Sequence, residues 1–325
     1  MTEPLLKVRG LKKHFAMESP IPFRKSTQSV KAVDGVSFDV FPGETLGIVG
    51  ESGCGKSTMA RLVNQLITPS GGTVEFKGEN LVGMEGKKLR DYRKSIQMVF
   101  QDPFASLDPR KTIGQLIAEP LVIHSIGNKE TRSARVKELL EVVGLSEYHA
   151  ERYPHEFSGG QRQRINIARA LALNPDVIIC DEPVSALDVS VQAQVINLLK
   201  QLQKEYNLTY IFISHDLNVV KYMCDRIAVM YLGKIVEMGT YNDLYDHPKH
   251  PYTKALLSAI PKESPHDKKE RIILTGSVPS PINPPSGCHF HERCPVALDI
   301  CKTVVPELKE TGNGHVASCH LLKDN

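Results

Sequence analysis

The chain has 325 residues, which suits one large domain or a domain of about 250 residues with a smaller addition. Hydrophobic residues make up 41% and charged residues 24% of the chain, as in an ordinary globular protein. Lys and Arg exceed Asp and Glu by only three (40 against 37), which argues against a protein whose main task is to bind nucleic acid.

The N-terminus has no charged lead followed by an apolar stretch, so we expect no signal peptide. No run of about 18 apolar residues occurs, so no segment is expected to span a membrane alone. These features predict a cytoplasmic protein, or one attached to a membrane through partners. The seven cysteines of such a chain argue against a disulfide framework.

The first third of the chain predicts strands followed by a helix. Residues 5–9 and 35–41 are rich in β-branched side chains, and residues 45–49 form an apolar run typical of a buried parallel strand. A helix is expected from Gly55, because the apolar positions that follow share one face. A basic run follows, which we interpret as the solvated face of a helix: Lys87, Lys88, Arg90, Arg93 and Lys94.

The central part predicts helices alternating with strands, a pattern that favours a parallel sheet covered by helices. The helices are expected over residues 129–145 and 190–206, and the strands over residues 176–180 and 209–214. Residues 226–239 predict a hairpin that turns at Gly233-Lys234. Four prolines between residues 279 and 285 predict a stiff, extended connector.

A phosphate loop follows the strand at residues 45–49. The segment Gly50-Glu-Ser-Gly-Cys-Gly-Lys-Ser57 fits the pattern G-x-x-x-x-G-K-[ST], in which backbone N–H groups, the lysine and a helix N-terminus bind phosphates. An accidental glycine-rich turn is the alternative, and the strand before and helix after the loop argue against it. The residues expected to contact nucleotide are Gly50, Ser52, Gly53, Cys54, Gly55, Lys56, Ser57 and Thr58.

Two acids end the apolar run Val177-Ile-Ile-Cys180. Ligands bind at the carboxyl ends of strands in parallel sheets, so Asp181 and Glu182 are candidates for the nucleotide site. Asp181 is expected in the shell of a magnesium ion with Ser57, and Glu182 is placed to polarise the attacking water. Taken alone, the two acids are equally compatible with a solvated strand end, and the phosphate loop favours the functional interpretation.

The segment Phe157-Ser-Gly-Gly-Gln161 resembles the signature of ABC ATPases, and further elements occur in the family's order across residues 4–260. These are Phe15 (an aromatic that stacks on adenine), Gln101 (glutamine loop), Ser185 to Asp188 (D-loop) and His215 (switch histidine). The resemblance implies a catalytic set of Lys56, Glu182 and His215. It adds Phe15 and Gln101 to the ATP site, and implies a magnesium set of Ser57, Gln101 and Asp181.

The signature has two interpretations. Ser158 and Gln161 form a capping box that would begin a helix, whereas Gly159 and Gly160 are poor helix residues. The resemblance implies that this bare helix N-terminus binds the γ-phosphate of ATP held by a second subunit, so that hydrolysis requires a dimer. The residues that would serve the partner's ATP are Ser158, Gly159, Gly160, Gln161 and Asp188.

The implied fold is α/β: a P-loop NTPase core of the ABC ATPase type with an antiparallel β subdomain, a helical signature subdomain and a small Cys-rich C-terminal extension. We expect the nucleotide-binding domain over residues 1–262, with the helical subdomain near residues 102–165 and the extension over residues 263–325.

The segments Lys31–Ser37 and His250–Leu257 and the proline-rich tail resemble the ATPases of bacterial dipeptide and oligopeptide importers. The resemblance implies an ATP-hydrolysing subunit, peripheral on the cytoplasmic face of the inner membrane. Its implied partners are two permease subunits, contacted through residues 103–123, a second similar ATPase in a heterodimer, and an extracytoplasmic peptide-binding protein.

Three other functions compete with peptide import. Importers of nickel or other small solutes share much of the pattern. A soluble ABC ATPase acting on nucleic acid or ribosomes is disfavoured by the single cassette and the lack of a long insertion. A catalytically inactive structural partner is disfavoured by Lys56, Glu182 and His215.

Four cysteines lie near the C-terminus, at Cys288, Cys294, Cys301 and Cys319. Their spacing lacks the C-x2–4-C pairs of zinc folds and is compatible with an iron–sulfur cluster. The peptide-importer resemblance implies a 4Fe–4S cluster with a structural or regulatory role. Zinc and no metal at all are the alternatives, and the histidines that could serve zinc are His289, His291, His315 and His320.

Overall fold

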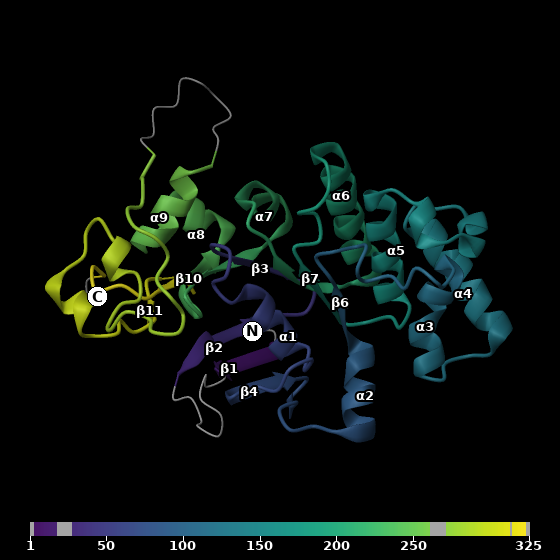
Figure 1. The fold of residues 1–325 in the computed structure, drawn as a ribbon, viewed down its shortest axis with the longest axis horizontal. Coiled ribbons are helices and arrows are strands. Elements are labelled where there is room, and N and C mark those ends of the chain that lie inside the picture. The colour runs from purple at the N-terminus through teal and green to yellow at the C-terminus, as the bar shows by residue number, and fades with distance from the viewer. Residues whose placement is uncertain (1–2, 18–27, 261–270, 313, 323–325) are drawn as a thin grey trace.

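The computed structural model describes residues 3–17, 28–260, 271–312 and 314–322. Two sheets and a group of helices make up the molecule (Figure 1). The expected domain boundary between residues 262 and 263 lies outside the described residues. Within the described part of the chain, no helix has the length and apolar character needed to cross a bilayer.

The smaller sheet is antiparallel, with strand order β2-β1-β4-β5. Its strands are β1 (Leu6–Ala16), β2 (Ser29–Val40), β4 (Gly71–Phe76) and β5 (Glu79–Asn80). The strands expected at residues 5–9 and 35–41 are therefore confirmed, but both are longer than the β-branched runs indicated. Leu6 faces Val40 in the β1–β2 register, and both are fully buried, so burial of one face stabilises this pair.

The larger sheet has the strand order β11-β12-β10-β9-β3-β8-β7-β6, and its strands from β9 to β6 are parallel. Its strands are β3 (Thr45–Val49), β6 (Ile96–Val99), β7 (Val177–Asp181), β8 (Thr209–Ile213), β9 (Arg226–Tyr231), β10 (Lys234–Thr240), β11 (Lys309–Glu310) and β12 (Val316–Ala317). The predicted parallel sheet is confirmed, and β9 and β10 form the predicted hairpin.

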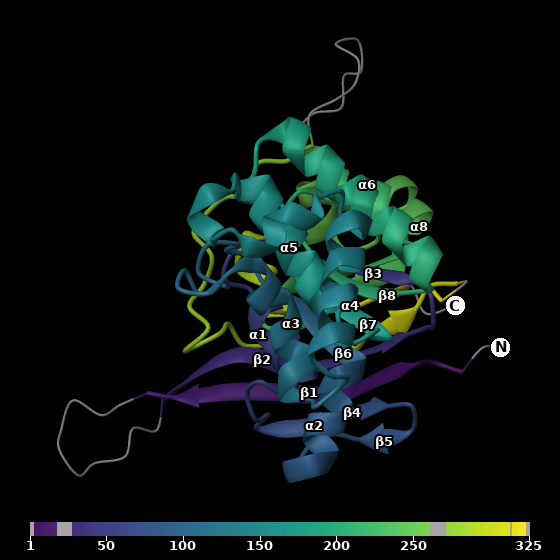
Figure 2. The same cartoon turned by 90° about the vertical axis from the view of Figure 1, so that its right-hand side faces the viewer.

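Alternating side chains of the large sheet enter two hydrophobic cores. On β8, Tyr210 and Phe212 belong to one core, and Ile211 and Ile213 belong to the other. The first core receives α6 (Val189–Tyr206) and α7 (Leu217–Met223), and the second receives α1 (Lys56–Val63) and the small sheet. Figures 1 and 2 show these layers on opposite faces of the large sheet.

A helical layer lies beyond β6, at one end of the large sheet (Figure 1). Its helices are α3 (Ile113–Ile123), α4 (Lys129–Val142), η1 (Glu147–Glu151), η2 (Pro154–Glu156) and α5 (Gly159–Leu171). The helix expected over residues 129–145 is confirmed, and the Asn128 side chain accepts from Thr131 N–H at its start. The basic run lies on α2 (Gly86–Ser95), where most of its side chains are exposed, as predicted.

The C-terminal residues pack against the large sheet. After α8 (Tyr241–Asp246) and α9 (Pro251–Ser258), the described chain resumes at residue 271 and contains η3 (His291–Arg293) and η4 (Asp299–Lys302). The connector between residues 279 and 285 has no helix or strand. Strand β12 pairs with β10, so the C-terminal residues extend the edge of the large sheet.

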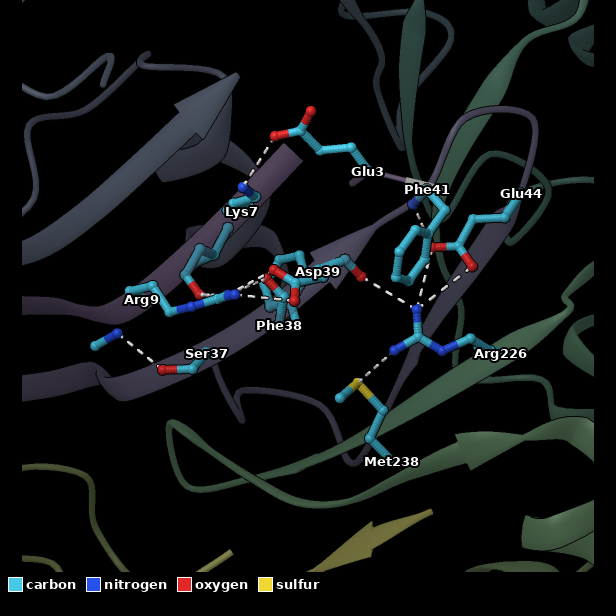
Figure 3. Close-up of polar contacts among 12 residues, drawn as sticks. Glu3, Lys7, Arg9, Ser37, Phe38, Asp39, Phe41, Glu44, Arg226 and Met238 are labelled. Carbon is cyan, nitrogen blue, oxygen red and sulfur yellow. Dashed lines mark hydrogen bonds and ion pairs between the residues drawn. The ribbon is translucent and has the colours of Figure 1, made fainter. Parts of the chain in front are cut away.

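Arg226 links the two sheets. Its guanidinium, on β9, donates to the Glu44 carboxylate at 3.2 Å and to the Asp39 carbonyl of β2 at 3.2 Å (Figure 3). Asp39 in turn accepts from Arg9 of β1 at 2.9 Å. These contacts join β2 of the small sheet to β9 of the large sheet and to Glu44, which directly precedes β3.

Candidate functional site

The phosphate loop joins β3 to α1, the strand–loop–helix context that its pattern requires. Gly50 and Gly55 have φ angles of 152° and 107°. A Cβ atom at Gly50 would lie 2.2 Å from the Met230 carbonyl oxygen, and one at Gly55 would lie 2.1 Å from the Ala32 carbonyl oxygen. Close backbone approach therefore requires glycine at both positions. The buried Lys56 ammonium donates to the carbonyl of Gly50 at 2.8 Å.

Asp181 ends β7 beside the loop. The Ser57 hydroxyl donates to its carboxylate at 2.8 Å. Burial raises the pKa of Asp181, and the Ser57 hydrogen bond opposes that rise. A carboxylate and a hydroxyl oxygen held together are the hard oxygen donors that Mg²⁺ prefers, so these two residues fit the magnesium site that the sequence predicts.

Two predicted residues, Gln101 and His215, contact a third, Glu182. Its Oε2 accepts from Gln101 Nε2 at 3.2 Å and lies 3.0 Å from His215 Nδ1. The three residues directly follow β6, β7 and β8 or lie close to their ends, so the parallel sheet brings them together. Glu182 itself has a φ of 47°, in the left-handed region that non-glycine residues seldom adopt.

A cavity of about 420 Å³ unites most of the predicted nucleotide and catalytic residues. The predicted residues that line it are Ser52, Gly53, Gly55, Lys56, Ser57, Thr58, Gln101, Glu182 and His215. Val30, Ala32 and Pro281 line it as well and were not predicted. An adjoining cavity of about 370 Å³ brings Gln101 to Ser57 and Asp181, the set predicted for magnesium.

Other predicted residues do not line the 420 Å³ cavity. Cys54 is buried among the apolar side chains behind the loop. Phe15 is 41% exposed, and the Lys13 ammonium lies 5.1 Å from the centre of its ring. The predicted stacking of Phe15 on adenine stays a prediction.

The signature residues and Asp188 also lie away from that cavity. Ser158 and Gln161 form the predicted capping box at the start of α5, since each backbone N–H donates to the other's side chain. A Cβ at Gly160 would lie 2.2 Å from Val191 Cγ1, so packing against α6 requires a glycine there. The chain's own helix packing thus accounts for one of the two glycines.

Three residues that support the loop were not predicted. The Glu51 carboxylate accepts two hydrogen bonds from Arg293, and the Glu51 N–H donates to the Tyr252 hydroxyl at 2.9 Å. The motif around His250 contained Tyr252, but nothing in the sequence pairs Arg293 with a residue 242 positions earlier.

The prediction of an iron–sulfur cluster on Cys288, Cys294, Cys301 and Cys319 is not supported. Within the described residues, which include all four cysteines, no group of three or more Cys, His, Asp or Glu side chains could hold a metal ion.

The zinc alternative is not supported either, because the absence of such a group among the described residues covers histidines as well as cysteines. Nitrogens of three of the histidines face backbone carbonyls, and His315 Nε2 lies 2.8 Å from the Glu237 carboxylate. The histidines with a ring nitrogen that faces a backbone carbonyl are His289, His291 and His320.

Known families match both halves of the chain. Residues 33–185 match the ABC transporter family, and residues 236–301 match the C-terminal region of oligopeptide/dipeptide transporters. Among solved structures, a bacterial ABC transporter cassette solved as a dimer with ADP and phosphate is 31% identical with a TM-score of 0.65, covering 73% of this chain and 98% of that chain.

Curated relatives match nearly the whole chain. The oligopeptide transport ATP-binding protein AppF of Bacillus subtilis is 57% identical, with 98% of each chain covered. The dipeptide transport ATP-binding protein DppF of Escherichia coli is 49% identical, over 98% of this chain and 95% of that protein. The chain therefore belongs to the ABC ATPases, in the family of oligopeptide and dipeptide transport ATP-binding proteins.

Proposed function

We propose that this ATPase hydrolyses ATP at the carboxyl ends of β3, β7 and β8 to drive peptide import through a membrane transporter. The observation that carries the proposal is the meeting of Gln101, Glu182 and His215 beside the phosphate loop. The names of its relatives support oligopeptides or dipeptides as cargo. An importer of nickel or another small solute is the alternative.

The residues divide the chemistry among them. Backbone N–H groups of the loop and Lys56 would hold the phosphates. Ser57 and Asp181 would hold Mg²⁺, with Gln101 beside them in the adjoining cavity. Bound Mg²⁺ would supply charge neutralisation at the phosphates.

Glu182 would orient the attacking water and accept its proton, because Glu182 lines the cavity that would hold the nucleotide. His215 would hold the Glu182 side chain through Nδ1 and present its other ring nitrogen to the γ-phosphate.

The signature residues Ser158 to Gln161 and Asp188 would serve ATP bound by a second subunit. Their separation from the chain's own cavity supports this assignment, as does a related cassette solved as a dimer. On this proposal two chains enclose two ATP molecules between them. We prefer a pair of this chain with a similar ATPase over a pair of identical chains.

The helical layer would be the signature subdomain and would meet the permease subunits. Three large apolar side chains of the predicted segment, residues 103–123, are more than half exposed, which supports a surface that a partner covers. They are Phe104, Val122 and Ile123. The chain would accordingly lie on the cytoplasmic face of the inner membrane, within a complex that includes an extracytoplasmic peptide-binding protein.

The proposed domains follow the same division. Residues 1–262 would be the nucleotide-binding domain, with its helical subdomain near residues 102–165. Residues 263–325 would be the peptide-importer extension. The match of residues 236–301 to a C-terminal region of peptide transporters supports a distinct C-terminal part, although β12 shares the large sheet with the cassette.

Reconstitution tests the function. The chain should co-purify with membrane-spanning subunits from detergent-solubilised membranes, and vesicles containing that complex and its binding protein should accumulate labelled peptide only with ATP. Uptake of nickel without uptake of peptide would favour the alternative. If the chain hydrolyses ATP but co-purifies with no membrane-spanning subunit, the transport role would be refuted.

A further inference from the structure

The C-terminal residues contact the phosphate loop through an ion pair. We call the described residues 271–312 and 314–322 the C-terminal segment. Its Arg293, on η3, donates to both oxygens of the Glu51 carboxylate, at 2.7 and 3.0 Å. The Arg293 side chain is only 8% exposed, and its bond to Glu51 raises the pKa of the guanidinium. A two-pronged bond of this kind fixes orientation as well as distance.

Glu51 is the second residue of the phosphate loop, and it is held at three points. Arg293 holds its carboxylate, the Tyr252 hydroxyl accepts from its N–H at 2.9 Å, and Lys56 donates to its carbonyl at 3.0 Å. Glu51 therefore links the C-terminal segment to Lys56, the side chain that would reach the ATP phosphates.

Packing fixes Arg293 in place. Its neighbour Phe290 is 1% exposed, and the centre of its ring lies 5.2 Å from that of Tyr231 and 5.3 Å from that of Tyr252. Tyr231 belongs to β9 and Tyr252 to α9, so this aromatic cluster joins η3 to the cassette. The ion pair thus lies on a rigid support rather than on a freely moving tail.

The C-terminal segment reaches the nucleotide cavity at a second place. The Pro281 carbonyl accepts from the Lys31 N–H of β2 at 3.0 Å, and Pro281 lines the cavity next to Val30. The proline-rich connector therefore forms part of the cavity wall on the side of the small sheet.

The ion pair changes the charge that the phosphate loop presents to a nucleotide. Glu51 is an acid within a loop that must bind polyanionic phosphates, and an unpaired carboxylate there would repel them. Arg293 neutralises that carboxylate and sets its direction. We propose that the C-terminal segment completes the nucleotide site and that Arg293 is a positioning residue, which holds the phosphate loop through Glu51 and masks its charge. This inference rests on the proposed function, in which the loop binds ATP.

The test is Mg–ATP binding to the full chain by calorimetry. Arg293→Ala should weaken ATP binding about tenfold, the cost of losing a charge-assisted hydrogen-bonded pair. Adding Glu51→Gln to that variant should restore most of the affinity, because the exposed carboxylate is then gone. The loss in Arg293→Ala should also shrink at high salt, since salt screens the unmasked charge.

Matched variants keep the test decisive. Lys302→Ala removes an exposed ion pair with Asp299 elsewhere in the C-terminal segment and should bind ATP as the wild type does. If Arg293→Ala fails to fold by circular dichroism, Arg293→Gln, which is closer in shape and also uncharged, carries the same comparison with and without Glu51→Gln.

Two results would overturn the inference: a folded Arg293→Ala with wild-type affinity, or a loss that Glu51→Gln does not reverse. Wild-type protein that binds no ATP would refute the proposed function and this inference with it, whereas wild-type binding with unaffected Arg293 variants would refute this inference alone.

Discussion

Glu182 and His215 form a hydrogen bond of 3.0 Å between Oε2 and Nδ1, although they follow different strands of the sheet. A carboxylate can only accept, so the proton lies on Nδ1 and leaves the other ring nitrogen free to face the nucleotide cavity. Glu182 holds this position with a φ of 47°, which costs about 1 kcal/mol or more in a non-glycine residue. The contacts with Gln101 and His215 thus hold a strained acid at the wall of the cavity, where the proposed function needs a base.

Glu182→Gln should abolish hydrolysis without abolishing ATP binding. The amide keeps the shape of the side chain but cannot accept the proton of water, so ATP turnover by the assembled transporter should fall at least about 100-fold. Calorimetry should show Mg–ATP affinity within a few-fold of wild type. Glu205→Gln, on the exposed face of α6, is the matched control and should leave turnover unchanged. Turnover above a tenth of wild type in Glu182→Gln would exclude Glu182 as the base.

His215→Gln should retain more activity than His215→Ala. Glutamine can still donate one hydrogen bond to Glu182 Oε2, whereas alanine leaves that oxygen with Gln101 alone. One hydrogen bond to a charged group corresponds to about tenfold in rate, so we expect roughly that ratio between the two variants. Equal turnover by the two variants would show that the contact with Glu182 does not position the acid.

Ser57→Ala should raise the Mg²⁺ concentration required for half-maximal ATP binding. The Ser57 hydroxyl is one of two oxygen donors held 2.8 Å apart, and its loss removes a ligand and the hydrogen bond that orients Asp181. Changes around metal sites typically cost 10- to 100-fold in metal affinity, so a shift of at least about tenfold is expected. Ser133→Ala on α4 is an exposed control. An unchanged Mg²⁺ requirement would remove Ser57 from the proposed set.

The sequence predicted the elements whose patterns are local. Residues 45–49 gave an apolar run that became β3, and Ser158 with Gln161 gave the cap of α5. Helix α3 was not predicted, and it contains Pro120, a residue that disfavours a helix interior, yet its capping box at Thr112 and its packing against α5 maintain it. Local signals of this kind specify elements but not their neighbours.

Contacts between distant segments could not be read from the sequence. The Arg293–Glu51 pair joins residues 242 positions apart, and neither residue type is distinctive alone. The prediction of an iron–sulfur cluster is not supported by the structure either. The spacing of four cysteines does not specify which side chains lie close enough to share a metal ion, and no such group is found among the described residues.

Glu237→Ala should destabilise the junction between the C-terminal segment and the large sheet. The fully buried Glu237 carboxylate accepts from the N–H groups of Lys249 and His250 and pairs with His315. Removing it leaves the buried His250 N–H, the buried His315 ring nitrogen and the half-buried Lys249 N–H without an acceptor. This should lower the free energy of unfolding in urea by about 3 kcal/mol or more. The exposed Glu307→Ala should change it by less than about 0.5 kcal/mol. Equal effects of the two variants would contradict this account.

His250 should make stability fall as the solution becomes acidic. Burial lowers the pKa of His250 to about 3, and its Nδ1 accepts from the Tyr252 N–H at 3.1 Å, a bond that protonation would remove. Because the pKa is near 6.5 in the unfolded chain, the stabilisation is complete above pH 6.5 and is lost progressively as pH falls toward 3.

Between pH 7 and pH 5 this group should reduce the free energy of unfolding by about 2 kcal/mol. His250→Asn keeps an acceptor for the Tyr252 N–H but does not titrate. Between the two pH values its free energy of unfolding should therefore fall by about 2 kcal/mol less than that of the wild type. His155→Asn, on an exposed histidine, should follow the wild type. Parallel urea-denaturation profiles for wild type and His250→Asn at the two pH values would show that His250 is not the titrating group. A difference of the expected size would show that the residue that caps α9, and so places Tyr252 against the phosphate loop, works only as the neutral imidazole.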